Sequence, residues 1–292
     1  PCSPFLVKGT AALLPAGART DTALLAIGVV LSTVMLAGGL VALRWLVTTA
    51  EGDEAVARRA VLYLLLFPTS FFFHCFYTES AFLLLSAAAF VAARRRAWWA
   101  AGVCGGLTAL TRPNGVLIAA PLLLAYLGAR EWKVRRVRAD VLWLALIPAS
   151  LLAYMAALYP VTGTLLAPLK VQAAWGKVLA TPGETLLEPR GTYPVTTAVE
   201  RGVVIVLLVV AVRAFWLLRD RSHAAYAALF LAAPLFTGIL NSQARYAAPL
   251  FPLFAALAVL GRRPRTDWTI RVVFGVGLAA AFAAWCQGYW VG

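Results

Sequence analysis

The stretch Ala81-Phe-Leu-Leu-Leu-Ser-Ala-Ala-Ala-Phe-Val-Ala-Ala-Arg-Arg-Arg96 passes from an apolar run directly into three arginines. An apolar run of this kind is typical of a helix in lipid, and arginines at its end are typical of the cytoplasmic boundary of a membrane. As a helix, residues 80–93 would rise only about 21 Å, whereas the hydrocarbon core is roughly 30 Å thick. The arginines can compensate by extending their side chains to the headgroups.

The same pattern recurs along the whole chain. Of the 292 residues, 62% are hydrophobic and 13% are charged, about half the charged fraction of a soluble domain. We therefore predict one all-α domain over residues 1–292, a polytopic membrane bundle in the lipid bilayer with about ten transmembrane helices. The expected helices lie at 22–45, 60–77, 80–93, 97–111, 115–129, 139–159, 201–218, 224–240, 246–261 and 270–290.

The basic residues predict the orientation of these helices. The chain has 26 Lys and Arg against 12 Asp and Glu, a net charge of +14. If the runs alternate across the bilayer, 18 of the 26 fall on one side, which the positive-inside rule identifies as cytoplasmic. This alternation places both ends of the chain on the outer side. No basic-aromatic pattern typical of RNA binding accompanies the charge, so we predict no nucleic-acid partner.

The longest polar stretch, at about 160–200, is predicted to be an outer-face loop rich in proline and glycine turns. Within it, residues 168–177 could form one short interfacial helix with Trp175 at the headgroup level. For Gln172 and Trp175, contact with a sugar or headgroup and simple anchoring in the interface are equally compatible with the sequence.

Two outer turns carry an arginine against the positive-inside bias. One is Thr111-Arg-Pro-Asn-Gly115, where Pro113 makes Arg112 extended and ends the helix. The other is Asn241-Ser-Gln-Ala-Arg-Tyr246, which contains Arg245. A guanidinium group suits bidentate binding of phosphate, although contact with lipid headgroups is the simpler alternative. We predict that Arg112 and Arg245 project from neighbouring helix tips into one shared hollow.

A third outer turn, Tyr77-Thr-Glu-Ser80, holds an acid between two apolar segments. Either Thr78 or Glu79 could cap the next helix, because a carboxylate is favourable at a helix N-terminus. A functional role for Glu79 is the alternative.

The sequence contains no pattern typical of a metal site, a catalytic triad or a nucleotide-binding loop. The four cysteines are isolated, and the two histidines form no metal-ligand spacing, so we predict neither a metal nor a cofactor. No Ser-His-acid arrangement, glycine-rich nucleotide loop or pair of helix carboxylates occurs. These absences disfavour an enzyme that uses a nucleotide sugar on the cytoplasmic face.

At these turns the chain resembles the PIG-V family of GT-C glycosyltransferases, whose eukaryotic members add the second mannose to glycosylphosphatidylinositol. The similarity is strongest over 58–70, Tyr77-Thr-Glu-Ser80, Trp98-Trp99 and Leu107-Thr-Ala-Leu-Thr-Arg-Pro-Asn-Gly115, and continues more weakly through 172–176, 242–246 and 250–254. The alanine- and arginine-rich composition resembles the bacterial branch of the family.

The resemblance implies a GT-C-like mannosyltransferase that moves a hexose from a polyprenyl- or dolichyl-phosphate donor to a glycolipid or glycan acceptor. The reaction would occur on the exoplasmic or lumenal face, in the plasma membrane of a bacterium or the endoplasmic reticulum of a eukaryote. The family's base lies in its first outer loop, and Pro1-Cys-Ser-Pro-Phe-Leu-Val-Lys8 resembles a motif that follows that loop. We therefore expect a fragment whose first helix and catalytic aspartate lie upstream of Pro1, with Glu79 as a weaker catalytic candidate.

These arguments assign candidate roles to particular residues. Arg112 and Arg245 are expected to bind the donor phosphate. Glu79 is expected to make a structural hydrogen bond or one to an acceptor hydroxyl. The expected pocket residues are His74, Tyr77, Asn114, Gln172, Trp175 and Tyr246. Two alternatives remain open: a transporter or flippase for a lipid-linked sugar, which would place charges at the bilayer midplane, and a non-catalytic assembly subunit.

Overall fold

The described part of the chain is built from helices, as the sequence predicts. The computed structural model describes residues 20–174, 176–187, 194–289 and 291, among which no strand occurs. The α-helices are α2 (Asp21–Glu51), α3 (Glu54–Leu66), α4 (Glu79–Arg94), α5 (Trp98–Thr111), α6 (Ala119–Ala129), α7 (Leu146–Thr162), α8 (Ala167–Ala174), α9 (Pro182–Leu187), α10 (Pro194–Leu217), α11 (Arg221–Ala232), α12 (Gln243–Ala247), α13 (Phe251–Leu260) and α14 (Pro264–Cys286). The 3-10 segments are η2 (Ser70–Phe73), η3 (Pro113–Ile118), η4 (Val134–Arg136), η5 (Ala139–Ala145) and η6 (Ala233–Phe236).

Three helical stretches within the described residues are long and apolar enough to cross a membrane. They are α2, the continuous stretch Ala139–Thr162 formed by η5 and α7, and α14. Other predicted spans are helical but interrupted near a proline: α3 ends before Pro68, α11 becomes η6 at Pro234, and Pro249 separates α12 from α13. Proline has no N–H to donate and disfavours the α conformation in the residue before it, which accounts for these interruptions. The figure of about ten transmembrane helices therefore stays a prediction.

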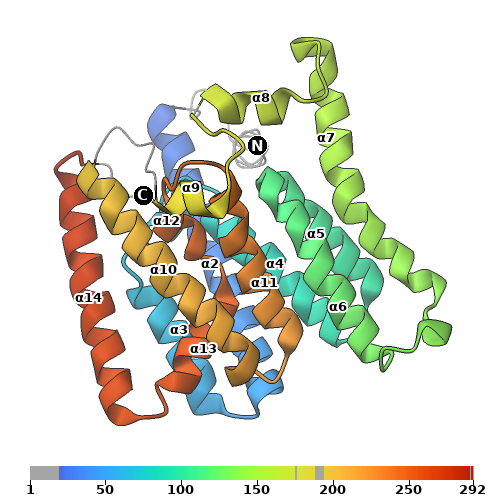
Figure 1. Ribbon diagram of the computed structural model, residues 1–292, viewed down its shortest axis with the longest axis horizontal. Helices are drawn as coiled ribbons and strands as arrows, with labels where there is room; N and C mark the ends of the chain where they lie inside the picture. The colour runs from blue at the N-terminus through green and yellow to red at the C-terminus, as the bar shows by residue number, and fades with distance from the viewer. Residues whose placement is uncertain (1–19, 175, 188–193, 290, 292) are drawn as a thin grey trace.

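The core lies where α2, α3, α4 and α13 meet, and α7 and α14 lie at opposite edges of the bundle (Figure 1). Tyr63, Phe82 and Phe254 are fully buried in this core. Helix α5 closely approaches η5, the segment that continues into α7, because a Cβ atom on Gly102 would lie 2.1 Å from the carbonyl oxygen of Trp143. Small residues at such positions let membrane helices pack closely.

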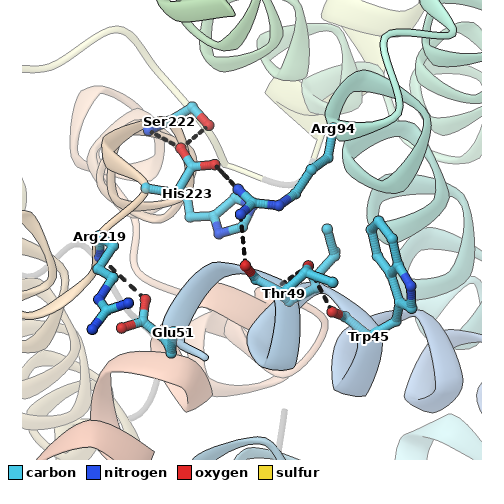
Figure 2. Close-up of polar contacts among 9 residues, drawn as sticks. Trp45, Thr49, Glu51, Arg94, Arg219, Ser222 and His223 are labelled. Atoms are coloured by element: carbon cyan, nitrogen blue, oxygen red, sulfur yellow. Dashed lines mark hydrogen bonds and ion pairs between the residues drawn. The ribbon is translucent and has the colours of Figure 1, made fainter. Parts of the chain in front are cut away.

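The two ends of the bundle differ. Figure 1 shows α8, α9 and α12 at one end, and the α6–α7 and α13–α14 connections at the other. At the latter end, ion pairs and hydrogen bonds tie several helix termini together. Arg94 Nη2 donates to the carbonyl oxygen of Thr49 at 2.6 Å, and the Arg219 amide donates to Glu51 at 3.1 Å (Figure 2). These contacts join α2, α4 and the start of α11.

Asp220 is the N-cap of α11 and also faces Arg94. Its Oδ1 accepts hydrogen bonds from the amide and the hydroxyl of Ser222, and its Oδ2 lies 3.5 Å from Arg94. Burial alone would raise the pKa of Asp220, but the His223 ring, the Ser222 hydrogen bonds and the Arg94 charge outweigh burial and hold that pKa below its ordinary value. The ionised carboxylate therefore stabilises this end of the bundle.

Asp220→Asn is expected to lower the free energy of unfolding by roughly 1–2 kcal/mol, because it removes the charge facing Arg94, whereas asparagine caps a helix about as well as aspartate. Since the folded pKa lies below the unfolded one, this stabilisation is present above about pH 4 and is lost as the pH falls through the folded pKa. Thermal unfolding in detergent at pH 7 and pH 3 measures both effects. Glu131→Gln is the control, because its exposed carboxylate pairs with the exposed Lys133 and Arg136, and surface ion pairs of this kind contribute little to the melting temperature. An equal loss at both pH values would contradict the assignment.

Candidate functional site

A pocket of about 700 Å³ lies between η3, α7, α8, η6 and α12. Its wall is apolar on the sides supplied by η3, α7 and η6, with residues such as Val116, Leu151 and Phe236. Three cations, Arg112, Arg245 and Lys177, line it as well, and no acidic side chain does so among the described residues. The pocket therefore suits an amphiphilic anion.

Arg112 and Arg245 meet on one buried carboxylate. Arg245 Nε donates to Glu79 Oε1 at 2.5 Å, and Arg112 Nη2 lies 2.7 Å from the same oxygen as an ion pair. The Glu79 side chain is fully buried, whereas each arginine side chain keeps 11% of its surface exposed. The second oxygen of Glu79, Oε2, is buried and has no hydrogen-bond partner within the described residues. The arginines thus share one neutralising charge and retain a net charge of +1.

Both guanidinium groups make cation–π contacts with aromatic rings. The Arg245 guanidinium lies 3.9 Å from the ring centre of Tyr77 and 4.9 Å from that of Phe72. The Arg112 guanidinium lies 5.0 Å from the Tyr246 ring centre, and its Nε donates to Thr78 Oγ1 at 3.0 Å. Cation–π contacts of this kind stabilise a cation where little water reaches it. Both groups are therefore held in place before any ligand arrives.

The turn at Arg112 explains how that side chain is aimed. Arg112 ends α5 in an extended conformation (φ −149°, ψ 141°), as the following Pro113 requires. Gly115 then lets η3 fold back onto α5, because a Cβ atom at this position would lie 2.4 Å from the carbonyl oxygen of Thr108. Asn114 and Arg112 consequently face the pocket together.

Arg245 is carried by the short helix α12, which is fixed by contacts from distant segments. The Gln243 amide donates to Glu200 Oε2 at 2.9 Å, and Thr69 Oγ1 donates to the carbonyl oxygen of Ala244 at 3.1 Å. Ser242, just before the helix, has a left-handed backbone (φ +61°), which is uncommon for a residue other than glycine. Such strain is often found at functional sites.

Helix α8 and residues 177–179 line another side of the pocket. Lys177 Nζ donates to Gln172 Oε1 at 2.8 Å, and both residues line the pocket. Partial burial lowers the pKa of the Lys177 ammonium group, since its charged form loses water. The amide of Val178 donates to the Thr237 carbonyl oxygen at 3.1 Å and holds this segment against η6.

The structure brings most of the predicted site residues together. Arg112 and Arg245 do share one hollow, and Asn114, Gln172 and Tyr246 line it with them. Tyr77 stacks on the Arg245 guanidinium but is not one of the residues that line the pocket. His74 does not line this pocket: it is exposed and its Nδ1 lies 3.3 Å from Thr33 Oγ1. Trp175 lies outside the described residues.

Helix α4 begins at Glu79 with Thr78 at its N-cap position, as the sequence predicts, although the Thr78 side chain makes no capping hydrogen bond. The Glu79 carboxylate pairs with the two arginines and is not among the residues that line the pocket. Its position favours the structural role over the catalytic one.

Sequence reasoning missed Lys177, Thr78 and the apolar wall. Lys177 is the last residue of the expected interfacial helix and lies on the predicted outer side, and that placement is a usable signal. Nothing local in the sequence indicates that η6 and α7 face the same space. Within the described residues, no cluster of His, Cys, Asp or Glu could hold a metal ion.

Comparison of the chain with protein-family models, curated proteins and solved structures found no match.

Proposed function

We propose that this protein is a multi-pass membrane glycosyltransferase whose pocket binds the phosphate of a polyprenyl-phosphate sugar donor. It would move a hexose, mannose by the resemblance to the PIG-V family, to a glycolipid or glycan on the exoplasmic or lumenal face. The observation that carries the proposal is the pair of largely buried guanidinium groups that share one carboxylate and line a pocket with an apolar wall. Guanidinium groups are well suited to phosphate because they donate several hydrogen bonds in a fixed plane.

The pocket suits both halves of such a donor. The phosphodiester would lie at Arg112, Arg245 and Lys177, and the isoprenoid chain would follow the apolar residues of η3, α7 and η6. When the sugar–oxygen bond breaks, a second negative charge develops on the departing phosphate. Cations already in place stabilise that charge without rearrangement, which is the usual source of rate enhancement in such a site.

The proposed topology is compatible with the position of this pocket. Helix α4 has 16 residues and rises about 24 Å from Glu79 to Arg94. That length is a few ångströms less than a hydrocarbon core, so with Arg94 at one headgroup boundary Glu79 would lie near the other. A charged triad near the boundary is less costly than one at the midplane. We propose that the remaining apolar segments complete about ten crossings.

The direct test is donor binding and turnover by the full-length protein in nanodiscs. Radiolabelled polyprenyl-phosphate-mannose should bind and, with membrane glycolipids as acceptors, should release free polyprenyl phosphate. Failure to bind both polyprenyl-phosphate-mannose and free polyprenyl phosphate would refute the proposal. A transporter would bind the donor and move it intact across the bilayer, so release of polyprenyl phosphate separates these two functions.

The pH dependence of binding should identify Lys177 as part of the site. Because its pKa is lowered, Lys177 loses its proton at a lower pH than an ordinary lysine, and donor affinity should fall as the pH rises through that value. Lys177→Arg should bind the donor with affinity that stays constant up to about pH 10, since arginine does not titrate there. Binding curves between pH 7 and pH 10 measure the difference. Identical curves for the two proteins would exclude Lys177 from the site.

A further inference from the structure

We propose that Glu79 is a positioning residue that sets the charge selectivity of the pocket, favouring a singly charged phosphodiester over a diphosphate. This inference rests on the proposed function, because it assumes that a phosphate binds at Arg112 and Arg245. It assigns to Glu79 a role separate from catalysis and from capping.

The first step is the charge at this end of the pocket. Glu79 Oε1 is within 2.7 Å of Arg112 and 2.5 Å of Arg245, so one carboxylate is shared between two guanidinium groups. Without Glu79 the arginines would present a charge of +2, and with it they present +1. The carboxylate has no exposed surface and cannot be displaced into water by a ligand at low cost.

The second step is the effect on competing ligands. A phosphodiester carries one negative charge, whereas a diphosphate ester carries about three near neutral pH. The negative charge of Glu79, which lies next to the two arginines, repels both ligands, and it repels the ligand of higher negative charge more strongly. A buried carboxylate behind the arginines therefore lowers the affinity for a diphosphate more than for a phosphodiester. Its orphaned Oε2 shows that the carboxylate is not held there by a full set of hydrogen bonds.

The experiment compares three ligands with the same C15 tail: farnesyl methyl phosphodiester, farnesyl phosphate and farnesyl diphosphate. Affinities are measured for the full-length protein in neutral detergent at pH 8 and fixed salt. The readout is the ratio of the diphosphate affinity to the phosphodiester affinity. Glu79→Gln should raise this ratio at least about tenfold, because it adds one unit of positive charge in a partly buried site.

Three further variants separate charge from structure. Arg112→Gln should lower the ratio, because it leaves Arg245 and Glu79 with no net charge. The double variant Glu79→Gln/Arg112→Gln restores a charge of +1 and should return the ratio close to that of the unmodified protein. Glu79→Asp keeps the charge and should keep the ratio, even if all three affinities fall.

The outcomes are distinguishable. If the unmodified protein binds none of the three ligands, the proposed function fails. If it binds them and the ratio does not change when Glu79 is replaced, Glu79 is only a structural counterion and this inference alone fails. Size-exclusion chromatography and thermal unfolding report whether each variant folds. If Glu79→Gln does not fold, Arg112→Gln is compared with the double variant, because these two proteins differ only by the replacement of Glu79. The ratio must then be higher for the double variant.

Discussion

Arg112→Ala is expected to lower the rate of sugar transfer from polyprenyl-phosphate-mannose by about 10²–10³-fold, the usual cost of removing one group that stabilises transition-state charge. Arg112 is fixed in the pocket by two contacts, since its Nη2 pairs with Glu79 while its Nε donates to Thr78. Arg112→Lys should recover little activity, since a single ammonium group cannot make both contacts and still face a phosphate. Arg245→Ala should behave like Arg112→Ala, because the two arginines share Glu79.

Lys170→Ala is the matched control for these variants. Lys170 lies on α8, two residues from the pocket-lining Gln172, but it is exposed and does not line the pocket. Removing its charge should leave transfer within about twofold of the unmodified protein, because exposed charges are screened by salt. Donor binding, turnover and a folding assay are measured on each variant. Unchanged turnover in folded Arg112→Ala, or an equal loss in Lys170→Ala, would remove the arginine pocket as the donor site.

Gly102→Leu is expected to have the largest effect on stability. Even a Cβ atom at Gly102 would lie 2.1 Å from the carbonyl oxygen and 2.7 Å from the carbonyl carbon of Trp143, and these are backbone atoms that cannot rotate away. We expect a loss of about 3 kcal/mol or more, at or beyond the upper end of the range for overpacked interiors. Because α7 carries Leu151 of the pocket wall, donor binding should fall with it.

Gly128→Ala is the control of opposite sign. Gly128 lies in α6, and a Cβ atom there would meet nothing within 4 Å. Alanine favours the helix over glycine by roughly 0.5–1 kcal/mol, so this variant should be as stable as the unmodified protein or slightly more stable. Denaturation in a mixed micelle, followed by tryptophan fluorescence, measures both changes. Equal stability of Gly102→Leu and Gly128→Ala would show that α5 and η5 are not in contact.

Features that depend on neighbouring residues could be predicted from the sequence. Apolar runs bounded by arginines predicted helices in nearly every region where the structure has them, because helix formation and burial in lipid depend on local composition. The Arg112-Pro113 turn was also predictable, since proline restricts the residue before it. The interruptions at Pro68, Pro234 and Pro249 follow the same rule, but the composition of an apolar run does not by itself indicate where a helix within it ends.

The site required the folded structure because its partners are far apart in the chain. Glu79 and Arg245 are separated by 166 residues, and no local pattern indicates that one carboxylate serves both Arg245 and Arg112. The apolar wall combines η3, α7 and η6, whose proximity depends on close backbone approaches such as that at Gly102. Local chemistry thus accounts for which residues are costly to leave near lipid, and long-range packing accounts for which of them neutralise one another.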